Sequence, residues 1–165
     1  QNSILFIIST GSLTLSQTQT FIYKLGTPNF MIKKAKEDYL RAIYHFQEEE
    51  SNMESGVSSI RLAEYLRISK PTVSEMLRKL IKENLVHKTP YGKINLTKKG
   101  LAESKAITKK HRIIEVFLAK ILKISPKTIH EEAHRLEHAF SSDSISSISR
   151  LIKNAKSCPH GKPIP

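Results

Sequence analysis

Residues 57–96 read VSSIRLAEYLRISKPTVSEMLRKLIKENLVHKTPYGKINL, and this stretch decides the fold. Apolar residues recur at helical spacing in two runs, a short one over residues 60–66 and a longer one over residues 70–84. Pro71 stands at an early helical position, where its missing N–H leaves no hydrogen bond unmade. Two short alternating runs around a turn at Gly92 then predict a β-hairpin. Together these elements indicate a winged helix-turn-helix.

Further helices are predicted on both sides of this stretch. One precedes it over residues 35–50, and three follow it, over residues 101–122, from Ser125-Pro126 to Phe140, and over residues 143–155. Residues 97–100 are expected to break the pattern after the hairpin. Residues 157–165, which include three prolines, are expected to form a linker-like or extended tail. The predicted fold class is mainly α, with a winged-helix domain over residues 31–100 and an all-helical dimerisation domain over residues 101–156.

Residues 1–30 differ in composition from the rest of the chain. Their only charged residue is Lys24, and their apolar run over residues 4–8 is too short, and lacks the basic flank, for a secretory signal. We expect this segment to lie outside the functional fold, with a short ordered extension as the alternative. No apolar run approaches the roughly 18 residues that a membrane span needs, so no membrane association is expected.

The charge balance indicates a polyanionic partner. Lys and Arg number 27 against 15 Asp and Glu, a formal net charge of +12. The absence of Trp argues against a stacking platform for single strands. Small hydroxyl residues stand at the start of the helix that begins at residue 70, where they can approach phosphates and base edges. Basic residues follow on the same helix and on the hairpin: Arg78, Lys79, Lys82, Lys88 and Lys93. These features favour double-stranded DNA, with a solvated charged face or a protein-binding winged helix as alternatives.

A metal site is predicted in the C-terminal half. His130, His134, Glu137 and His138 fall within an arc of about 100° on one helix face. His111 and Glu115 form a second i, i+4 pair on the preceding helix. The single Cys excludes a multi-thiolate zinc site. Imidazoles and carboxylates without thiolate suit Mn²⁺, Fe²⁺, Co²⁺, Ni²⁺ or Zn²⁺.

An enzymatic alternative arises from the same helix. His130-Glu131-Glu132-Ala133-His134 fits the H-E-x-x-H signature of zinc peptidases, in which the first Glu would be the general base. Such a site needs a third protein ligand, and no Glu follows Glu137 in the chain. The peptidase is therefore the weaker hypothesis.

Four segments resemble the iron-dependent repressor family: residues 37–44, 69–74, 110–115 and 130–138. The tail over residues 158–165 is similar to the family's linker, and the resemblance extends from residue 32 to residue 165. It implies a cytoplasmic, non-enzymatic homodimer that binds palindromic double-stranded operator DNA when Mn(II) or Fe(II) is bound and represses metal-uptake genes. Zn(II) or Co(II) is expected to bind in vitro. A metal-independent winged-helix regulator remains the alternative.

The resemblance also assigns residues to each site. It implies one metal site formed by His111, Glu115 and His130, and another formed by Asp38, His134, Glu137 and His138. On the DNA side it implies base-reading positions at Ser69, Pro71 and Glu75, and phosphate contacts near Ser59, Thr72, Ser74, Lys79 and Lys82. Asp38 and His134 replace the sulfur ligands of iron-sensing members, and Arg41 stands where manganese-sensing members have Glu.

Overall fold

The computed structural model describes residues 28–50 and 56–165, so the expectations for residues 1–27 lie outside the described residues. The chain divides into two units, residues 1–35 and residues 36–165. Of the first unit, the described part is the beginning of helix α2, Pro28–Glu49. This helix begins before residue 35, where the apolar periodicity starts, and its first residue is a proline, which favours a helix start.

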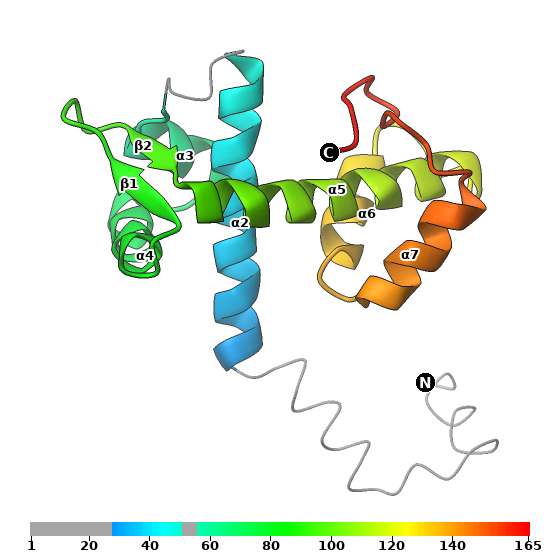
Figure 1. The fold of residues 1–165 in the computed structure, drawn as a ribbon, viewed down its shortest axis with the longest axis horizontal. Helices are drawn as coiled ribbons and strands as arrows, with labels where there is room; N and C mark the ends of the chain where they lie inside the picture. The colour runs from blue at the N-terminus through cyan, green and yellow to red at the C-terminus, as the bar shows by residue number, and fades with distance from the viewer. Residues whose placement is uncertain (1–27, 51–55) are drawn as a thin grey trace, which may run out of the picture. The chain divides into compact units, whose positions relative to one another are not determined.

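The second unit contains the predicted winged helix (Figure 1). Its elements are α3 (Ser59–Leu66), α4 (Lys70–Lys82), β1 (Val86–Lys88) and β2 (Ile94–Leu96). Ser58 caps α3 by accepting a hydrogen bond from the Arg61 N–H, and Ser69 caps α4 by accepting one from the Thr72 N–H. The strands pair antiparallel with Val86 opposite Leu96. The fold prediction for this part is therefore confirmed.

One apolar core joins α2 to the winged helix. Leu40 and Ile43 of α2 are fully buried in the same cluster as Val73 and Leu80 of α4. Burial of these side chains removes apolar surface from water, which holds α2 against α4. A displacement of α2 therefore has to move α4 as well.

The expected break at residues 97–100 is wrong, because α5 (Lys98–Lys120) begins there. Thr97 is its N-cap and accepts a hydrogen bond from the Gly100 N–H. Gly100 does not end a helix but allows a close approach: a Cβ atom at this position would lie 1.9 Å from the Leu85 carbonyl oxygen. The glycine thus permits contact between α5 and the chain entering β1.

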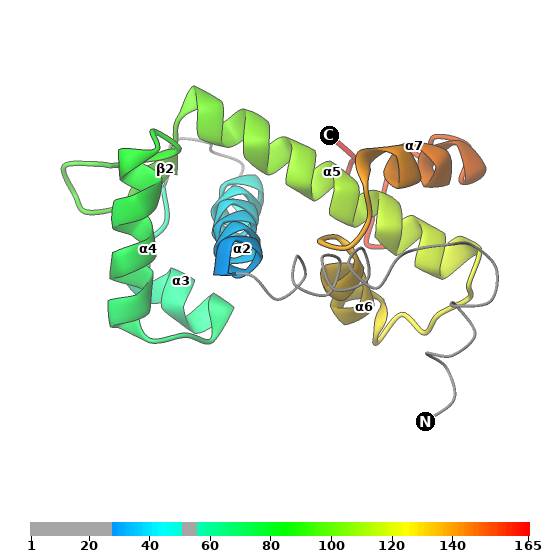
Figure 2. The ribbon, with the colours of Figure 1, turned by 90° about the horizontal axis from the view of Figure 1, so that it is seen from below.

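The remaining helices pack along α5 (Figure 2). Helix α6 (Ile129–Leu136) contacts it through a core that includes Ile114, Leu118 and Ala133, and α7 (Ser142–Leu151) packs on it as well. Helix α6 is shorter than predicted. Residues 126–128 form a turn before it, and the Ala139 N–H bonds the Leu136 carbonyl in a tightened last turn.

The tail is a folded loop rather than an extended end. The Cys158 N–H bonds the Lys162 carbonyl at 2.9 Å, and the Gly161 N–H bonds the Cys158 carbonyl at 2.9 Å. Cys158 is buried against the apolar cluster of α5 that contains Ile113 and Val116. Among the described helices, none has the length and apolar character required to cross a membrane.

Candidate metal centre and DNA-binding surface

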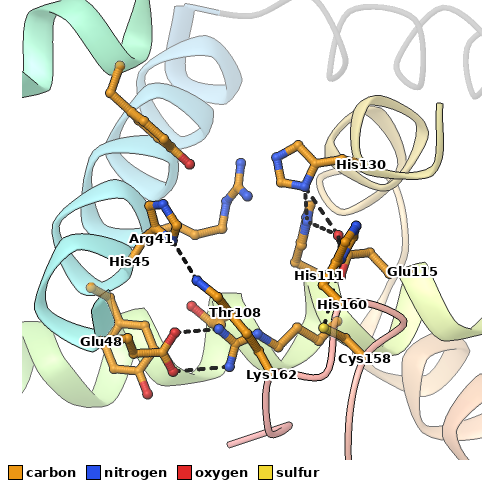
Figure 3. Close-up of a pocket in the computed structure, with 13 residues that line it drawn as sticks. Arg41, His45, Glu48, Thr108, His111, Glu115, His130, Cys158, His160 and Lys162 are labelled. Atoms are coloured by element: carbon orange, nitrogen blue, oxygen red, sulfur yellow. Dashed lines mark hydrogen bonds and ion pairs between the residues drawn. The ribbon is translucent and has the colours of Figure 1, made fainter. Parts of the chain in front are cut away.

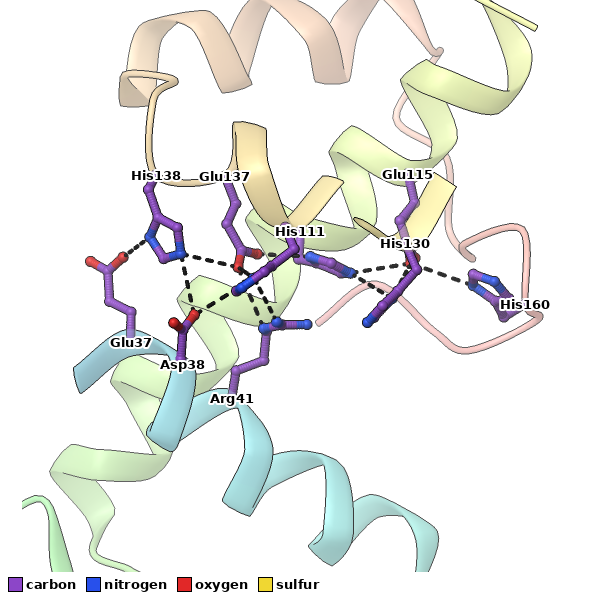
Figure 4. A network of polar contacts seen from close by, with 10 residues as sticks. Glu37, Asp38, Arg41, His111, Glu115, His130, Glu137, His138 and His160 are labelled. Atoms are coloured by element: carbon purple, nitrogen blue, oxygen red, sulfur yellow. Dashed lines mark hydrogen bonds and ion pairs between the residues drawn. The ribbon is translucent and has the colours of Figure 1, made fainter. Parts of the chain in front are cut away.

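The seven predicted metal ligands converge in two clusters within the second unit (Figure 4). In each cluster, one donor atom from every residue lies within 4.8 Å of the others. We call them the Asp38 cluster, formed by Asp38, His134, Glu137 and His138, and the His111 cluster, formed by His111, Glu115 and His130. Both combine imidazole nitrogens with carboxylate oxygens, the donor set predicted from the sequence.

The Asp38 cluster joins α2 to the α6 segment. His138 Nε2 lies 3.2 Å from Asp38 Oδ1 and 3.4 Å from Glu137 Oε1. His134 Nδ1 lies 2.8 Å from Glu137 Oε1 and 3.6 Å from Asp38 Oδ1. Four donor atoms from two separate helical segments thus face one another, as a divalent cation requires.

Glu37 orients His138 from outside the cluster. His138 Nδ1 lies 2.8 Å from Glu37 Oε2, so a proton on Nδ1 leaves the Nε2 lone pair facing Asp38 and Glu137. Burial lowers the pKa of His138, but the hydrogen bonds with Asp38, Glu137 and Glu37 outweigh it and raise that pKa to about 10. Protons and metal ions therefore compete for this imidazole. Glu37 carries no sequence signal of this role beyond its place next to Asp38.

The His111 cluster is compact and mostly buried. His111 Nε2 lies 3.1 Å from Glu115 Oε1 and 3.2 Å from His130 Nδ1, and His130 Nδ1 lies 3.1 Å from Glu115 Oε1. Burial raises the pKa of the Glu115 carboxyl, but hydrogen bonds from His111 and His130 reverse the effect and leave the pKa well below its usual range. Glu115 is therefore ionised and available as an anionic ligand at neutral pH.

Glu137 contacts both clusters. Its Oε1 faces the Asp38 cluster, and its Oε2 lies 2.7 Å from His111 Nδ1. Burial opposes ionisation of this carboxyl, yet hydrogen bonds from His111, His134 and His138 hold its pKa far below the usual range. A proton on His111 Nδ1 leaves His111 Nε2 free to face Glu115 and His130. One buried carboxylate thus orients ligands in both clusters.

Two tail residues that are not among the seven predicted ligands extend the His111 cluster. His160 Nδ1 lies 3.5 Å from Glu115 Oε1, and Cys158 Sγ lies 3.9 Å from His160 Nδ1. Glu115, Cys158 and His160 form a further group of converging donors. Their only sequence signal was a Cys-x-His spacing inside a segment interpreted as a linker.

A cavity of about 290 Å³ lies beside the His111 cluster (Figure 3). Helix α2 lines it with Arg41, Tyr44 and His45, and α5 lines it with Thr108 and Arg112. Arg112 forms an ion pair with Glu48. Arg112 thus connects α5 to α2 outside the two clusters, whereas the Asp38 cluster is the one of the two that includes an α2 residue.

The structure separates the two histidines of the H-E-x-x-H segment. His130 belongs to the His111 cluster, whereas His134 belongs to the Asp38 cluster. Glu131, the residue that would act as general base, is exposed. The segment therefore does not form the shared zinc site that a peptidase requires.

The predicted DNA-contacting residues lie on α4 and at the start of α3. All of those on or next to α4 are exposed, and Ser59 is half-buried: Ser59, Ser69, Pro71, Thr72, Ser74, Glu75, Lys79 and Lys82. Ser69 also caps α4, and Lys79 Nζ pairs with Glu75 Oε1 at 2.8 Å. Arg78 and Lys88 line a groove between α4 and the hairpin. This surface is basic and accessible.

Comparison with known proteins gives a consistent result. The N-terminal DNA-binding domain of the iron-dependent repressors matches residues 31–94, and their metal-binding and dimerisation domain matches residues 97–165. An HTH-type transcriptional regulator of Methanocaldococcus jannaschii is 37% identical over 120 residues, which make up 73% of this chain and 94% of that protein. The diphtheria toxin repressor of Corynebacterium efficiens is 34% identical over 131 residues, 78% of this chain and 54% of that protein.

A solved structure is similar over the same region. The manganese regulator SloR superposes with a TM-score of 0.69 at 41% identity, covering 79% of this chain and 59% of that one. The chain thus spans little more than half the length of SloR and of the Corynebacterium repressor.

Fold and clusters together define a winged-helix protein with an attached helical metal-ligand domain. The chain belongs to the iron-dependent repressor family, as both family domains match it in order.

Proposed function

We propose that this protein is a metal-dependent transcriptional repressor that binds a palindromic operator as a homodimer. The observation that carries the proposal is the Asp38 cluster, in which a winged-helix residue meets three ligands of the α6 segment. We further propose that the two clusters are its metal sites and that the exposed residues of α4 contact the operator. The corresponding domains comprise residues 31–100 and 101–156, followed by the tail.

The contacts of Asp38 explain how metal occupancy reaches DNA. A divalent ion bound at this cluster would neutralise the carboxylates and hold Asp38 against His134 and His138. Asp38 lies on α2, two residues before the buried Leu40, and Leu40 packs in the core that contains Val73 of α4. Fixing Asp38 therefore fixes the orientation of the recognition helix. Two such helices, one per protomer, would match two half-sites.

The donor sets support different metals at the two clusters. The Asp38 cluster offers nitrogen and oxygen donors, which suit Mn²⁺ or Fe²⁺, and SloR is a manganese regulator. The His111 cluster has the Cys158 thiol nearby, which favours softer ions such as Zn²⁺ or Co²⁺. We infer that Mn(II) or Fe(II) is the activating ion and that Zn(II) or Co(II) binds in vitro.

Apolar surface at the ends of α5 and α7 supports the dimer. Ile121, Leu122 and Leu151 are 44%, 52% and 56% exposed, respectively. Leu118, on helix α5, is instead buried within the chain at 2% exposure and does not contribute to this surface. A two-fold interface over the exposed residues would cover them. Sedimentation of a monomer at micromolar concentration with metal present would contradict this assignment.

The decisive experiment is metal-dependent DNA selection. Random double-stranded DNA is enriched on the full chain with Mn²⁺ present, and the selected duplex is then titrated by fluorescence anisotropy with Mn²⁺ or with chelator. We expect a palindromic sequence that binds tightly with Mn²⁺ and weakly with chelator. Equal binding under both conditions would favour a metal-independent winged-helix regulator instead.

A further inference from the structure

A cationic side chain lies within the Asp38 cluster. Arg41 follows Asp38 by one turn of α2, and its side chain is 15% exposed. Its Nη2 lies 3.0 Å from His134 Nδ1, and its Nε lies 3.6 Å from Glu137 Oε1 (Figure 4). A guanidinium carries its charge at every pH that a folded protein experiences. Arg41 therefore contacts two of the four proposed ligands as a fixed positive charge.

The contact with His134 has a definite direction. A guanidinium has hydrogen-bond donors and no acceptor, so His134 Nδ1 accepts from Arg41 with its lone pair in the tautomer that carries its proton on Nε2. In the other tautomer the same nitrogen donates to Glu137 Oε1, 2.8 Å away, and it is the His134 atom that converges with the other donors. A metal ion needs that same lone pair. The Arg41–His134 hydrogen bond and a metal bond from Nδ1 therefore exclude each other.

The surroundings of Arg41 leave room for the guanidinium to move. Arg41 also lines the cavity of about 290 Å³, beside Tyr44, His45 and Tyr65 (Figure 3). Its buried Nε finds no hydrogen-bond acceptor among the described residues. A side chain released from His134 can thus turn into the cavity while staying near Glu137.

We propose that Arg41 is a specificity-determining residue that competes with the metal ion at the Asp38 cluster. The proposal rests on the proposed function of that cluster as a metal site. Each metal ion that binds has to displace Arg41 from His134. The cluster is therefore occupied only at a higher free metal concentration than it would be if its four ligands had no contact with Arg41. The remaining positive charge beside Glu137 also restricts the cluster to a single divalent ion, because a second ion would lie close to the guanidinium.

The experiment measures Mn²⁺ binding to full-length variants by isothermal titration calorimetry, with free Mn²⁺ counted by electron paramagnetic resonance. All variants carry His130→Ala and His160→Ala, which remove two half-exposed imidazoles from the other site. Arg41→Met removes the charge and keeps the volume, and Arg41→Lys keeps the charge. Arg135→Met, on the same helix as His134 but 65% exposed, is the matched control.

Arg41→Met should bind Mn²⁺ about tenfold more tightly, the effect of removing one close charge–charge repulsion worth about 1.4 kcal/mol. The Arg41→Lys and Arg135→Met variants should bind Mn²⁺ with nearly the same affinity as the protein that carries only His130→Ala and His160→Ala, which we call the background. Thermal unfolding in chelator should show no stabilisation by Arg41→Met, which separates charge competition from a general gain in stability.

Two results would overturn the proposal. If Arg41→Met binds Mn²⁺ equally or more weakly, Arg41 supports the ligands rather than competing with the ion. If Arg41→Lys binds as tightly as Arg41→Met, charge is not the cause. A background that binds no Mn²⁺ would instead refute the Asp38 cluster as a metal site, and with it the proposed function.

Discussion

His111 Nδ1 lies 2.7 Å from Glu137 Oε2, while Glu137 Oε1 faces His134 and His138. One carboxylate therefore connects the Asp38 cluster, to which it belongs, with the His111 cluster, and a substitution of Glu137 changes the contacts of both. Glu137 is 1% exposed, so water cannot replace its contacts.

Glu137→Gln should weaken metal binding at both clusters. The amide keeps the shape but loses the negative charge, and its NH₂ group can only donate toward one of the two clusters. We expect at least a tenfold loss of affinity at the Asp38 cluster, and a loss of about ten- to a hundredfold at the His111 cluster, where Glu137 orients a ligand. Metal titration of each site checks this, with Glu132→Gln as control. An unchanged His111 cluster would show that the contact with Glu137 is dispensable.

Asp38→Ala should uncouple metal binding from DNA binding. Three ligands on the α6 segment remain and can still hold an ion, but α2 loses its direct ligand to it. We expect weaker yet measurable Mn²⁺ binding, and loss of most of the Mn²⁺-stimulated affinity for the selected duplex in anisotropy. Asp143→Ala, at an exposed position in the first turn of α7, should behave as the unmodified protein. Full activation of Asp38→Ala at matched free Mn²⁺ would limit the ion to a local structural role.

Helical periodicity predicted most of these ligands. His130, His134 and Glu137 lie on one short helical segment, so their relative directions follow from about 100° of rotation per residue. Asp38 comes from a helix almost a hundred positions away, and only the family resemblance indicated it. Glu37 and His160 were not predicted, and Arg41 was noted only as a departure from the manganese-sensing members, because the contacts of all three depend on tertiary packing that no local pattern encodes.

Gly100 is a second position whose role depends on a tertiary contact that the local sequence does not reveal. Its sequence context indicated a break, but its function is defined by a distant carbonyl. Gly100→Ala would place a Cβ atom 1.9 Å from the Leu85 carbonyl oxygen, in contact with backbone that cannot turn aside. We expect a loss of about 1–3 kcal/mol in the free energy of unfolding, measured in urea. Gly161→Ala, whose Cβ would have nothing within 4 Å, should cost only the strain of its positive φ of 79°.

The stability of the chelator-treated protein should fall as the pH rises from neutral toward 10. The pKa of His138 is raised to about 10 in the folded state, from an ordinary value of 6.5 for a histidine side chain. A raised pKa stabilises the fold fully below the unfolded value and loses that contribution as the pH rises through the folded value. The Tm in chelator should therefore decline between about pH 6.5 and 10. His138→Gln should flatten this decline, and an unchanged slope in that variant would assign it to other groups.

The Glu115 and Glu137 carboxyls change the stability of the protein in the opposite direction with pH. Glu115 and Glu137 have depressed pKa values, so their stabilising contacts are present above the pKa of the unfolded carboxyls and are lost as the pH falls through the folded values. Acid should therefore destabilise the chelated protein as well. Maximum stability should lie between the acidic range, in which the carboxyls lose their contribution, and the alkaline range, in which His138 loses its own. This places it on the acidic side of neutral.

Glu75 and Lys79 should affect DNA binding in different ways. Their ion pair of 2.8 Å holds the Lys79 ammonium beside a carboxylate on the exposed face of α4. Lys79→Ala should weaken binding to every duplex and reduce the slope of log affinity against log salt by less than about 1, because Glu75 already offsets part of its charge.

Glu75→Gln should change the preferred base at one position in each half-site, because the carboxylate can only accept whereas the amide can also donate. It also frees Lys79 for phosphate, so overall affinity should rise. Anisotropy titrations at several salt concentrations, with the selected duplex and its single-base variants, measure both effects. Lys120→Ala, at the far end of α5, is the charge-matched control for Lys79→Ala. A uniform change in affinity with no altered base preference in Glu75→Gln would remove Glu75 from the set of base-reading residues and leave it as a partner of Lys79.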